Sequence, residues 1–378
     1  MSKRKEHKIP ILSFFSGGGF MDMGFEQAGF EVIWTNEFDE IFAKLHAAGM
    51  TSWRKSQGNG IKAEIFNTKS ITEVKSEEII LEAFPNGKPE HFGMIGGPPC
   101  QDFSQNGSLK GFNGERGKLT VVYFNKILEL RPTFFVMENV PGLIRRNETR
   151  EYLKLILQNV ENEYIVDFEK LNSLNFGVPQ HRERVFFIGI RKDCASKKLR
   201  VKAESGKWFP FPVAEKYYNA AIKFNWGKQT PFGNKLRKPK NVPIELCVES
   251  CLIPLNKMDK IPNAGEFFTL YKPLSELATI DEGETNRPSF KRLHRFKYSP
   301  TACYGNNEVH LHPYLHRRIS AREALRIQGV SDEYVLPENL SLSKKFKMIG
   351  NGVPVPLAKA VAESLKDFIR VNEIIPNL

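Results

Sequence analysis

The sequence predicts an α/β fold for residues 1–191, then an irregular region, then a return to the α/β pattern. Short apolar segments that favour strands alternate with longer segments of helical periodicity, as in a sheet with helical crossovers. The expected strands cover Ile9–Phe15, Phe30–Thr35, Phe92–Ile95, Phe134–Met137, Tyr164–Leu171 and Arg184–Ile190. The expected helices cover Phe20–Ala28, Asp39–Ala48, Lys118–Leu130, Arg150–Val160, Ser320–Gln328 and Pro354–Val371.

The texture of the sequence changes after Arg191. From about Lys192 to Tyr298 the chain is rich in proline, lysine and aromatic residues and has poor periodicity, as in Trp208–Pro212. We therefore predict a separate irregular domain at 192–298, inserted between a first part at 1–191 and a second part at 299–378 of one α/β domain.

The bulk composition points to a polyanionic partner. The 378-residue chain has a formal net charge of +12, with 41% hydrophobic and 26% charged residues. Each lysine or arginine near a phosphate releases condensed counterions, so such a surplus favours binding to nucleic acid. A ribosomal protein or one that binds a membrane surface would show a similar charge.

The cysteines predict free thiols without a metal site. Cys247 and Cys251 lie four residues apart, without a CxxC pattern or a nearby histidine, so we expect no bound metal. The cysteines are sparse and odd in number, as is typical of a reducing cytoplasm. The apolar stretch 9–15 has no signal-peptide cleavage site, and no apolar run has membrane-spanning length. We predict a cytoplasmic protein that does not enter a membrane.

A glycine turn follows the first expected strand and suggests a cofactor site. Backbone can approach a ligand closely at Ser16–Gly19, and Glu37 follows the next strand, where a carboxylate commonly binds ribose hydroxyls. Phe15 and Phe38 flank these positions and could pack on an adenine. A plain tight turn and simple core packing fit the same residues. Phe20 stands where the dinucleotide fingerprint would have a further glycine, which favours a ligand without a pyrophosphate, such as S-adenosylmethionine.

A cysteine directly follows another expected strand. Cys100 closes the segment Gly96–Cys100, at the sheet edge where open α/β folds place their chemistry, and Pro98 and Pro99 stiffen its approach. This position favours a nucleophile over the alternative, a small buried apolar residue. The glycine-dotted stretch 102–118 could close over a substrate, or it could be an ordinary surface loop.

Two further elements bring charge to the same edge. Glu138 ends the strand Phe134–Met137 and could act as an acid or as a hydrogen-bond partner of a base. Arg182 and Arg184 are two apart on an extended segment, project to one face, and could pair with a carbonyl oxygen and a phosphate. The alternatives are a helix-capping glutamate and ordinary surface arginines.

Taken together, six segments resemble, in order, the motifs of cytosine-5 DNA methyltransferases of the bacterial restriction-modification type. The segments are Phe15–Gly19, Pro99–Gln101, Glu138–Val140, Gln180–Arg184, Arg322–Gly329 and Gly350–Pro354. The resemblance covers roughly residues 9–191 and 296–365. It implies a Rossmann-like S-adenosylmethionine-dependent domain with a small inserted target-recognition domain, and a C-terminal helix that returns beside the first strand.

The resemblance also implies a reaction and roles for its residues. Cys100 would add to carbon 6 of a flipped cytosine, Arg182 and Arg184 would favour its thiolate, Arg184 would bind the base O2 atom, and Glu138 would bond N3. The expected cofactor contacts are Phe15, Ser16, Gly17, Gly19, Glu37, Phe38, Pro99, Asn351 and Gly352. The implied partners are double-stranded DNA and a restriction endonuclease. The implied setting is a monomer in a bacterial cytoplasm, held at the nucleoid through DNA.

Candidate DNA contacts lie in the loop after the cysteine and in two basic clusters. The clusters at Lys223–Lys240 and Arg287–Lys297 interleave cations with aromatic residues, although a solvated basic surface would look the same. We expect Gln105 or Asn106 to help fill the gap left by a flipped base. The full set of predicted DNA contacts is Gln101, Ser104, Gln105, Asn106, Lys228, Lys235, Arg237, Lys291, Arg292 and Arg295.

Rival functions are separated by small features of the sequence. A tRNA cytosine-5 methyltransferase would carry a Cys-Phe-Thr signature, which is absent here. An inert DNA-binding relative is disfavoured by intact Cys100, Glu138 and Arg184, and a nicotinamide oxidoreductase would have no use for them. The chain departs from the family pattern at Phe20, and Ser70–Ile71 is the nearest match to its adenine-contacting acidic motif.

Overall fold

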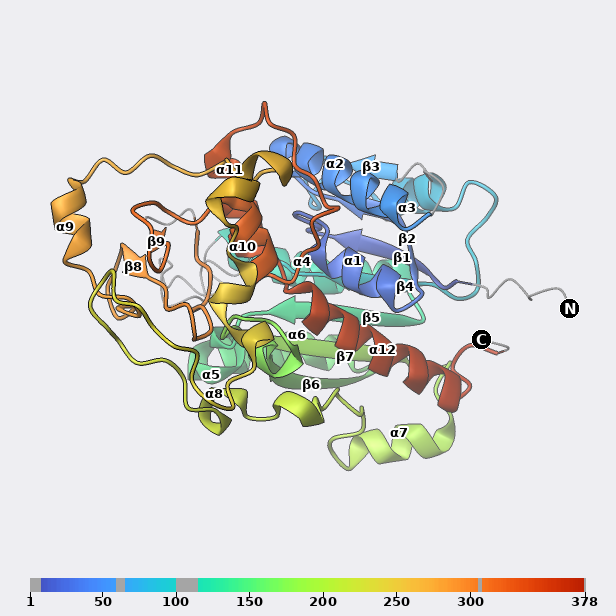
Figure 1. The fold of residues 1–378 in the computed structure, drawn as a ribbon. Helices are drawn as coiled ribbons and strands as arrows, with labels where there is room; N and C mark the ends of the chain where they lie inside the picture. The colour runs from blue at the N-terminus through green and yellow to red at the C-terminus, as the bar shows by residue number, and fades with distance from the viewer. Residues whose placement is uncertain (1–7, 59–64, 100–114, 305–307, 377–378) are drawn as a thin grey trace, which may run out of the picture.

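The computed structural model describes residues 8–58, 65–99, 115–304 and 308–376. A seven-stranded sheet forms its centre, in the order β3-β2-β1-β4-β5-β7-β6 (Figure 1). The strands are β1 Pro10–Phe14, β2 Glu31–Asn36, β3 Ile65–Asn67, β4 Gly93–Gly96, β5 Phe134–Asn139, β6 Tyr164–Asn172 and β7 Glu183–Arg191. Strands β1 to β5 pair in parallel, and β7 is antiparallel to both β5 and β6. The predicted α/β class is confirmed.

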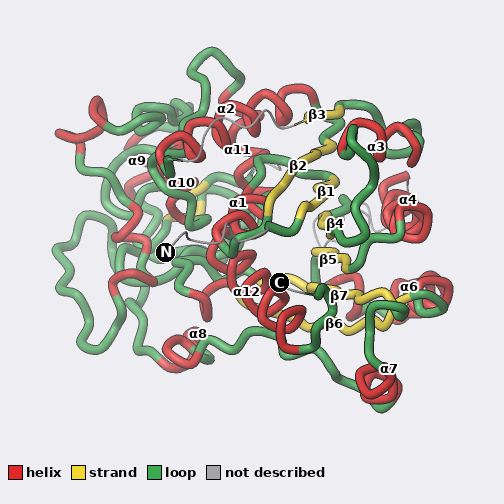
Figure 2. The backbone as a smooth tube through the Cα atoms, turned by 90° about the vertical axis from the view of Figure 1, so that its right-hand side faces the viewer, coloured by secondary structure: helices red, strands yellow, loops and turns green. Residues whose placement is uncertain are grey.

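Helices cover both faces of this sheet. Figure 2 shows α1 and α12 on one side of the strands and α3, α4 and α6 on the other. Successive strand residues point to opposite faces, so that Ile11 joins the core under α12 while Leu12 joins the core under α4. This two-sided burial explains why the central strands are continuous apolar runs. The large helices are α1 Phe20–Gln27, α2 Glu40–Ser56, α3 Ser76–Ala83, α4 Glu115–Leu130, α6 Asn147–Val160 and α12 Val355–Val371.

The C-terminal helix returns to the start of the chain, as the resemblance implied. Helix α12 packs on α1, and a Cβ added to Gly24 would come within 2.6 Å of Ala358 Cβ. The two helices therefore approach closely because position 24 has no side chain. Helices α10 Ala321–Ile327 and α11 Leu342–Asn351 complete a third core with α1 and α2. No helix in the described part of the chain is both long and apolar enough to span a membrane.

The ends of the predicted irregular domain, residues 192–298, contact the neighbouring parts of the chain. Leu199, Trp208 and Phe209 belong to the core between the sheet and α12, and the Trp208 ring centroid lies 5.4 Å from that of Phe368. At the other end, β9 His310–Leu311 pairs with β8 Lys291–Arg292. Packing and strand pairing thus extend past both ends of the irregular sequence, and the domain bounds 192–298 stay a prediction.

Short elements make up the rest of the structure. The remaining α-helices are α5 Gly142–Arg145, α7 Lys197–Glu204, α8 Ala220–Lys223 and α9 Leu274–Ala278. Short 3-10 helices lie at Ser173–Phe176, Glu215–Tyr217, Ile244–Leu246, Val248–Cys251 and Leu255–Lys260. The sequence analysis missed β3, α3, α5, α7, α8, α9 and α11, and it ended α2 eight residues early, at Ala48 instead of Ser56.

Candidate active site

The carboxyl ends of the parallel strands gather the predicted site residues at one edge of the sheet. The glycine turn follows β1, Glu37 follows β2 and Gly97–Pro99 follows β4. Glu138 is the last residue but one of β5. Because β7 is antiparallel, its first residues, including Arg184, arrive at this same edge. The sheet topology thus unites side chains that are far apart in the sequence.

The turn after β1 and the carboxylate after β2 are hydrogen-bonded to each other. Gly17 N donates to Glu37 Oε2 at 2.9 Å, and Asp39 N donates to Glu37 Oε1 at 2.9 Å. Phe15, Gly17 and Gly19 all have positive φ, at 52°, 54° and 73°. Burial raises the pKa of Glu37, and the two backbone hydrogen bonds oppose this rise. Each carboxylate oxygen keeps a second lone pair, which can accept a hydroxyl donor.

The surroundings of this turn fit an adenosine-bearing cofactor. Phe38 is 70% exposed, so its ring is available to an adenine. Ser16 Oγ is buried and has no hydrogen-bond partner among the described atoms, and a Cβ added to Gly17 would meet nothing within 4 Å. Open space and an unsatisfied hydroxyl therefore lie beside Glu37. Phe15 is half-buried against Tyr123, with ring centroids 6.2 Å apart.

The glycine turn is supported from behind by residues that the sequence analysis did not select. Tyr334 Oη donates to Gly18 O at 2.7 Å, and the His46 ring lies where a Cβ on Gly19 would come within 2.8 Å. Asp22, at the start of α1, accepts from Ser13 Oγ of β1 at 2.6 Å. Asp22 and His46 lie at helical positions whose neighbours on the same face are apolar, a signal that could have identified them. Tyr334, distant in the sequence, gives no such signal.

Phe20 takes a structural part where the family pattern has a glycine. Its ring is 1% exposed and lies where a Cβ on Gly352 would come within 2.3 Å. It also packs edge-on against Tyr334 at 5.5 Å. Gly352 is therefore close to the turn, as its predicted cofactor role requires, while the neighbouring Asn351 is exposed. Ile71 is buried at 3% and Ser70 bonds Thr72, so neither provides an acidic contact for an adenine.

Glu138 and Arg184 form a buried ion pair at the end of β5. Arg184 Nε lies 2.7 Å from Glu138 Oε1, and Glu138 is 8% exposed. Burial raises the pKa of the Glu138 carboxyl, against the opposing charges of Arg184 and, more weakly, Arg182. A Cβ added to Gly97 would lie 3.1 Å from Glu138 Oε2, so the segment that leads to the cysteine passes over this carboxyl group.

Cys100, the predicted nucleophile, lies outside the residues that the structure describes. Asn139 Nδ2 donates to Pro98 O at 3.3 Å and ties the preceding segment to β5, and Pro99 is half-buried. Cys100 follows Pro99 directly in the chain. The predicted residues outside the described range are Cys100, Gln101, Ser104, Gln105 and Asn106.

Arg182 has a different environment from Arg184. It is 1% exposed, and its guanidinium donates to Ala302 O at 3.0 Å, Gly350 O at 2.9 Å and Asn351 O at 3.3 Å. These bonds hold the start of β7 against α11. They give Arg182 a positioning role, and its expected effect on the Cys100 thiolate stays a prediction.

Two buried glutamines make a similar link that the sequence analysis missed. Gln180 Nε2 donates to Gln328 Oε1 at 3.0 Å, and Gln180 Oε1 accepts from Ala302 N at 3.0 Å. Gln328 Nε2 donates in turn to Ile349 O at 2.6 Å. Both residues lie inside the quoted motifs, but a buried glutamine and an exposed one look the same in a sequence.

The basic residues of the irregular domain fall into two groups. Lys228, Lys235 and Arg237 are exposed, as a DNA contact requires. By contrast, Arg292 is 1% exposed, and its guanidinium donates to the carbonyls of residues 277, 280 and 312. We correct its predicted DNA contact to a structural role, because its donors are already used.

The remaining basic candidates have acidic partners. Lys291 Nζ lies 2.9 Å from Glu308 Oε1. Arg295 Nη2 lies 2.6 Å from Oε2 of the buried Glu282. Neither side chain is a free surface cation.

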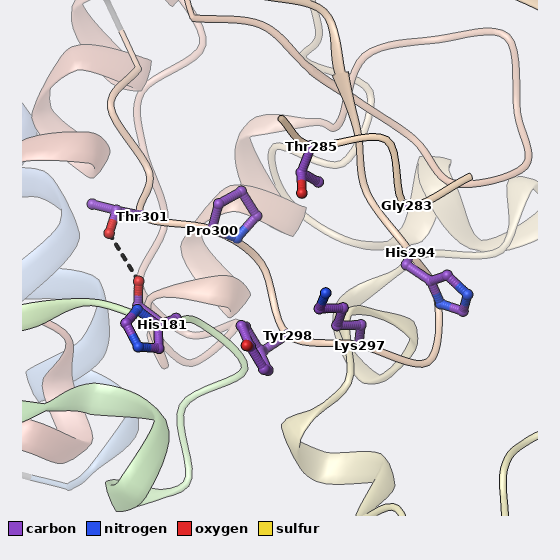
Figure 3. A pocket seen from close by; sticks show the side chains of 8 residues that line it. All are labelled: His181, Gly283, Thr285, His294, Lys297, Tyr298, Pro300 and Thr301. Carbon is purple, nitrogen blue, oxygen red and sulfur yellow. Dashed lines mark hydrogen bonds between the residues drawn. The ribbon is translucent and has the colours of Figure 1, made fainter. Parts of the chain in front are cut away.

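A cavity is lined by His181, which lies just before β7, and by residues between 283 and 301. It has a volume of about 370 Å³. Figure 3 shows His181 and Thr301 on one side and Gly283 and His294 on the other, with Lys297 and Tyr298 below. Thr301 Oγ1 donates to His181 O at 2.8 Å, and His181 directly precedes Arg182 in the chain. The cavity is therefore lined by a residue three positions before Arg184, which pairs with Glu138.

Comparisons with known proteins identify the family. A family model, C-5 cytosine-specific DNA methylase, matches residues 9–367. Over 374 residues the chain is 38% identical to the Type II methyltransferase M.NmeDI of Neisseria meningitidis serogroup C, covering 97% of this chain and 86% of that one. Over 373 residues it is 32% identical to the Type II methyltransferase M.FnuDI of Fusobacterium nucleatum, covering 97% of each.

The fold has solved counterparts as well. One is a crystal structure from E. coli, of a prophage-encoded protein described as a DNA modification methyltransferase. It aligns with a TM-score of 0.65 at 24% identity, and the alignment covers 96% of this chain and 100% of that chain. At this identity the likeness supports the fold alone. The family match, by contrast, extends over nearly the whole sequence and includes every element of the site described above. The chain belongs to the C-5 cytosine-specific DNA methylase family.

Proposed function

We propose that this DNA cytosine-5 methyltransferase modifies one cytosine of a specific duplex sequence through a covalent bond between Cys100 and carbon 6 of the base. The observation that carries this proposal is the buried Glu138–Arg184 pair, which lies under the segment leading to Cys100. Carbon 5 of cytosine is a weak nucleophile, so it needs electrons from an addition at carbon 6. A cysteine thiolate provides such an addition.

The reaction balances in two stages. The Cys100 thiolate bonds to carbon 6, the electron pair of the carbon 5–carbon 6 double bond moves to carbon 5, and carbon 5 takes the methyl group. Carbon 5 then gives up its proton to a base, the double bond re-forms, and the thiolate leaves. When bound, S-adenosylmethionine would supply the methyl group from its sulfonium, and a neutral thioether would remain.

Glu138 and Arg184 act on the base during this addition. The raised pKa of Glu138 favours its protonated form, which can donate a hydrogen bond to N3 as charge enters the ring. Arg184 pairs with Glu138 through Nε, and its Nη1 donates to Glu183 O at 2.7 Å. The other N–H groups of this guanidinium can donate to the base O2 atom. Both groups are preorganised, so little rearrangement accompanies the chemistry.

The cofactor would be held by the turn after β1 and its supports. Glu37 would accept the ribose hydroxyls, Phe38 would cover the adenine, and Ser16 Oγ would find its missing partner in the ligand. Phe15, Gly17 and Gly19 shape this turn, and Pro99 and Gly352 border it. Asn351, exposed beside Gly352, would contact the same ligand.

The target base must leave the duplex to reach Glu138, because this carboxyl is buried. Base flipping costs about a few kcal/mol in unstacking and lost pairing. We assign the clamp to residues 102–118, with Gln105 or Asn106 filling the gap. The exposed Lys228, Lys235 and Arg237 would contact the DNA backbone.

The biological role we propose is protection of host DNA beside a restriction endonuclease. The Type II names of the similar proteins from Neisseria and Fusobacterium support it. Both halves of the site come from one chain, so we further propose that the monomer is active.

Expression in a methylation-free bacterial host, followed by bisulfite sequencing of the host genome, tests this function. We expect protected cytosines within one short sequence motif, and none with the Cys100→Ala variant. Purified enzyme with labelled cofactor should label duplex DNA and leave tRNA unlabelled. Labelled tRNA, or an unmodified genome, would contradict the proposal.

A further inference from the structure

An exposed basic loop is hydrogen-bonded to His294, a residue that lines the cavity. This loop, residues 228–240, is defined by its exposed cations, which are Lys228, Lys235, Arg237, Lys238 and Lys240. Thr230 and Glu282 attach it to the following segment by two backbone hydrogen bonds, at 3.0 and 2.8 Å. The loop has little regular structure of its own, so its course depends on such attachments.

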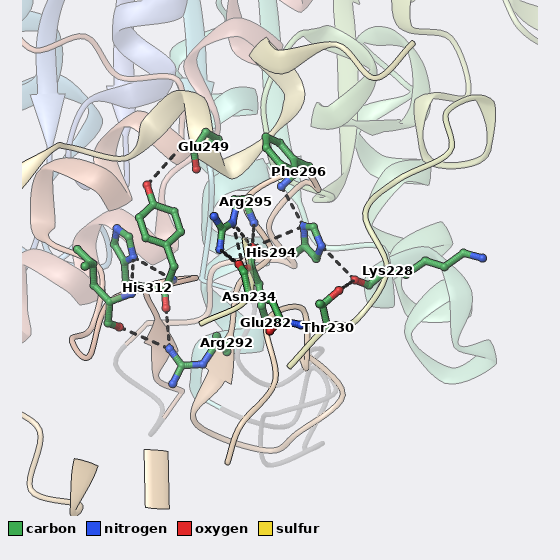
Figure 4. Close-up of polar contacts among 12 residues, drawn as sticks. Lys228, Thr230, Asn234, Glu249, Glu282, Arg292, His294, Arg295, Phe296 and His312 are labelled. Carbon is green, nitrogen blue, oxygen red and sulfur yellow. Dashed lines mark hydrogen bonds and ion pairs between the residues drawn. The ribbon is translucent and has the colours of Figure 1, made fainter. Parts of the chain in front are cut away.

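A buried ion pair makes the second attachment (Figure 4). Glu282 is 1% exposed and accepts from Arg295 Nε at 2.9 Å, Arg295 Nη2 at 2.6 Å and Arg295 N at 2.8 Å. Arg295 Nη2 also donates to Asn234 O, in the middle of the basic loop, at 3.3 Å. The guanidinium carbon lies 4.3 Å from the ring centre of Tyr314, whose hydroxyl bonds Glu249 at 3.3 Å. The pair thus connects the loop to the rest of the protein.

His294 makes the third attachment. Phe296 N donates to His294 Nδ1 at 2.9 Å, so the opposite nitrogen, Nε2, carries the proton that bonds Lys228 O at 3.1 Å. The ring fits closely between two glycines. A Cβ on Gly227 would come within 2.0 Å of the ring, and one on Gly283 within 3.1 Å. Burial lowers the pKa of His294, which keeps the ring neutral for these two bonds.

These hydrogen bonds occupy side chains of Arg295 and His294 that could otherwise contact DNA. Arg295 has its donors on Glu282 and Asn234, and His294 has both nitrogens engaged. Yet Gly283 and His294 line the cavity whose other wall holds His181. The basic loop is therefore fixed in relation to the catalytic edge by groups that do not themselves face solvent.

We propose that Glu282, Arg295 and His294 are positioning residues that set the course of the basic loop 228–240, and that this loop discriminates the recognition sequence in duplex DNA. The inference rests on the proposed function and names the part of the chain that selects the substrate. Direct readout needs side chains held in register with base edges. A loop that is basic but loosely attached would bind phosphates without discriminating sequences.

The test compares Glu282→Gln with Glu284→Gln. Both variants remove one negative charge from the same segment, but Glu284 pairs with Arg287 at 2.6 Å and does not contact the basic loop. The recognition sequence is first read from the wild-type bisulfite experiment. For each variant, kcat/KM is then measured on the cognate duplex and on duplexes with one base pair changed. Cofactor affinity and thermal stability are measured alongside.

We expect Glu282→Gln to lower the cognate-to-changed ratio of kcat/KM by about tenfold or more, the size of one lost base discrimination. Cofactor affinity should stay unchanged, and Glu284→Gln should keep the wild-type ratio. If Glu282→Gln does not fold, Arg295→Lys serves instead, since it keeps a cation beside Glu282 and loses the fork that reaches Asn234. A folded variant of either kind with the wild-type ratio would overturn the inference. Failure of the wild-type enzyme to methylate DNA would instead overturn the proposed function.

Discussion

At the scale of single residues, the mechanism that we propose depends on how the buried Glu138 carboxyl is kept protonated. Glu138 lies 2.7 Å from an arginine nitrogen, which alone would favour the ionised form. Burial acts in the opposite direction and is the larger effect, so the pKa of Glu138 is raised. The site therefore combines a carboxylic acid with a fixed cation, and both can address the same pyrimidine edge.

Substitution of Glu138 should separate chemistry from cofactor binding. Glu138→Gln keeps the shape of the side chain and removes the acidic proton, so we expect the rate of methyl transfer to fall by about a hundredfold or more. The affinity for S-adenosylmethionine, measured by calorimetry, should be unchanged, because Glu37 and not Glu138 borders that site. A single-turnover rate close to the wild-type rate would contradict the role of Glu138.

The raised pKa also predicts a pH dependence of stability. In the folded protein Glu138 binds its proton more tightly than in the unfolded chain, whose value is about 4.5. Its protonation therefore contributes stability that is fully present below about 4.5 and is lost as pH rises through the folded-state pKa. Urea unfolding from acidic to neutral pH should show this loss in the wild-type protein. The Glu138→Gln variant should lack this component.

Arg182 and Arg184 should differ in what their loss affects. Arg182→Met leaves the carbonyls of residues 302 and 350 buried without a donor, so we expect the free energy of unfolding to fall by about 3 kcal/mol. Arg184→Lys keeps a charge beside Glu138 and loses the Nε donor, so it should reduce the methylation rate with little loss of stability. Denaturant titrations and methylation rates of both variants test this contrast. Equal effects on stability would contradict it.

At the scale of elements, the turn after β1 is built around Phe20 where the family pattern has a glycine. Gly352→Ala would bring a Cβ within 2.3 Å of the Phe20 ring, so we expect a loss of about 1–3 kcal/mol in the free energy of unfolding. Gly265→Ala is the control, since a Cβ there would meet no atom within 4 Å. In a double-mutant cycle, Phe20→Leu should reduce the cost of Gly352→Ala. Additive effects would mean that the two positions are not coupled.

The strands that could be predicted from the sequence are those whose residues are buried along the whole strand. β1, β4 and β5 are buried on both faces, so they stand out as apolar runs between turn residues. β3 has three residues, too few for a pattern. Helix α11 begins Leu-Ser-Lys-Lys, and its packing against α2 and α10 selects its buried face.

Site residues that directly follow a strand could be predicted from the sequence. The environment of a basic residue could not be predicted where tertiary packing determines which partner it meets. Glu37 and Glu138 could be placed at one edge because the carboxyl ends of parallel strands share it. Arg184 reaches the same edge at the start of the antiparallel strand β7. Arg292 and Arg295 look like surface cations in the sequence, but Arg292 meets backbone carbonyls and Arg295 meets Glu282. The proline-rich sequence around Trp208 likewise gives no sign that this residue packs in the core beside the sheet.

At the scale of the whole molecule, the net charge of +12 should govern affinity for DNA. The logarithm of the association constant should fall steeply and linearly with the logarithm of salt concentration. Lys235→Ala combined with Arg237→Ala should lower the magnitude of this slope by about 2, one for each lost phosphate contact. Lys197→Ala with Lys198→Ala removes the same charge from α7, which lies far from β8 and β9 in Figure 1. That control should keep the wild-type slope, and an equal change in both would contradict a localised DNA surface.

The central claim is that Cys100 bonds covalently to the cytosine ring, and a mechanism-based trap measures it directly. In ordinary cytosine, carbon 5 loses a proton after methyl transfer and the thiolate then leaves. In a duplex with 5-fluorocytosine at the target position, carbon 5 carries fluorine, which is not lost in this way, so the covalent adduct persists. With S-adenosylmethionine present, we expect a protein–DNA band that survives a denaturing gel. Cys303→Ala should retain this band and Cys100→Ala should lack it. A Cys100→Ala protein that still forms the band, or a wild-type protein that methylates ordinary DNA and never forms it, would contradict the mechanism.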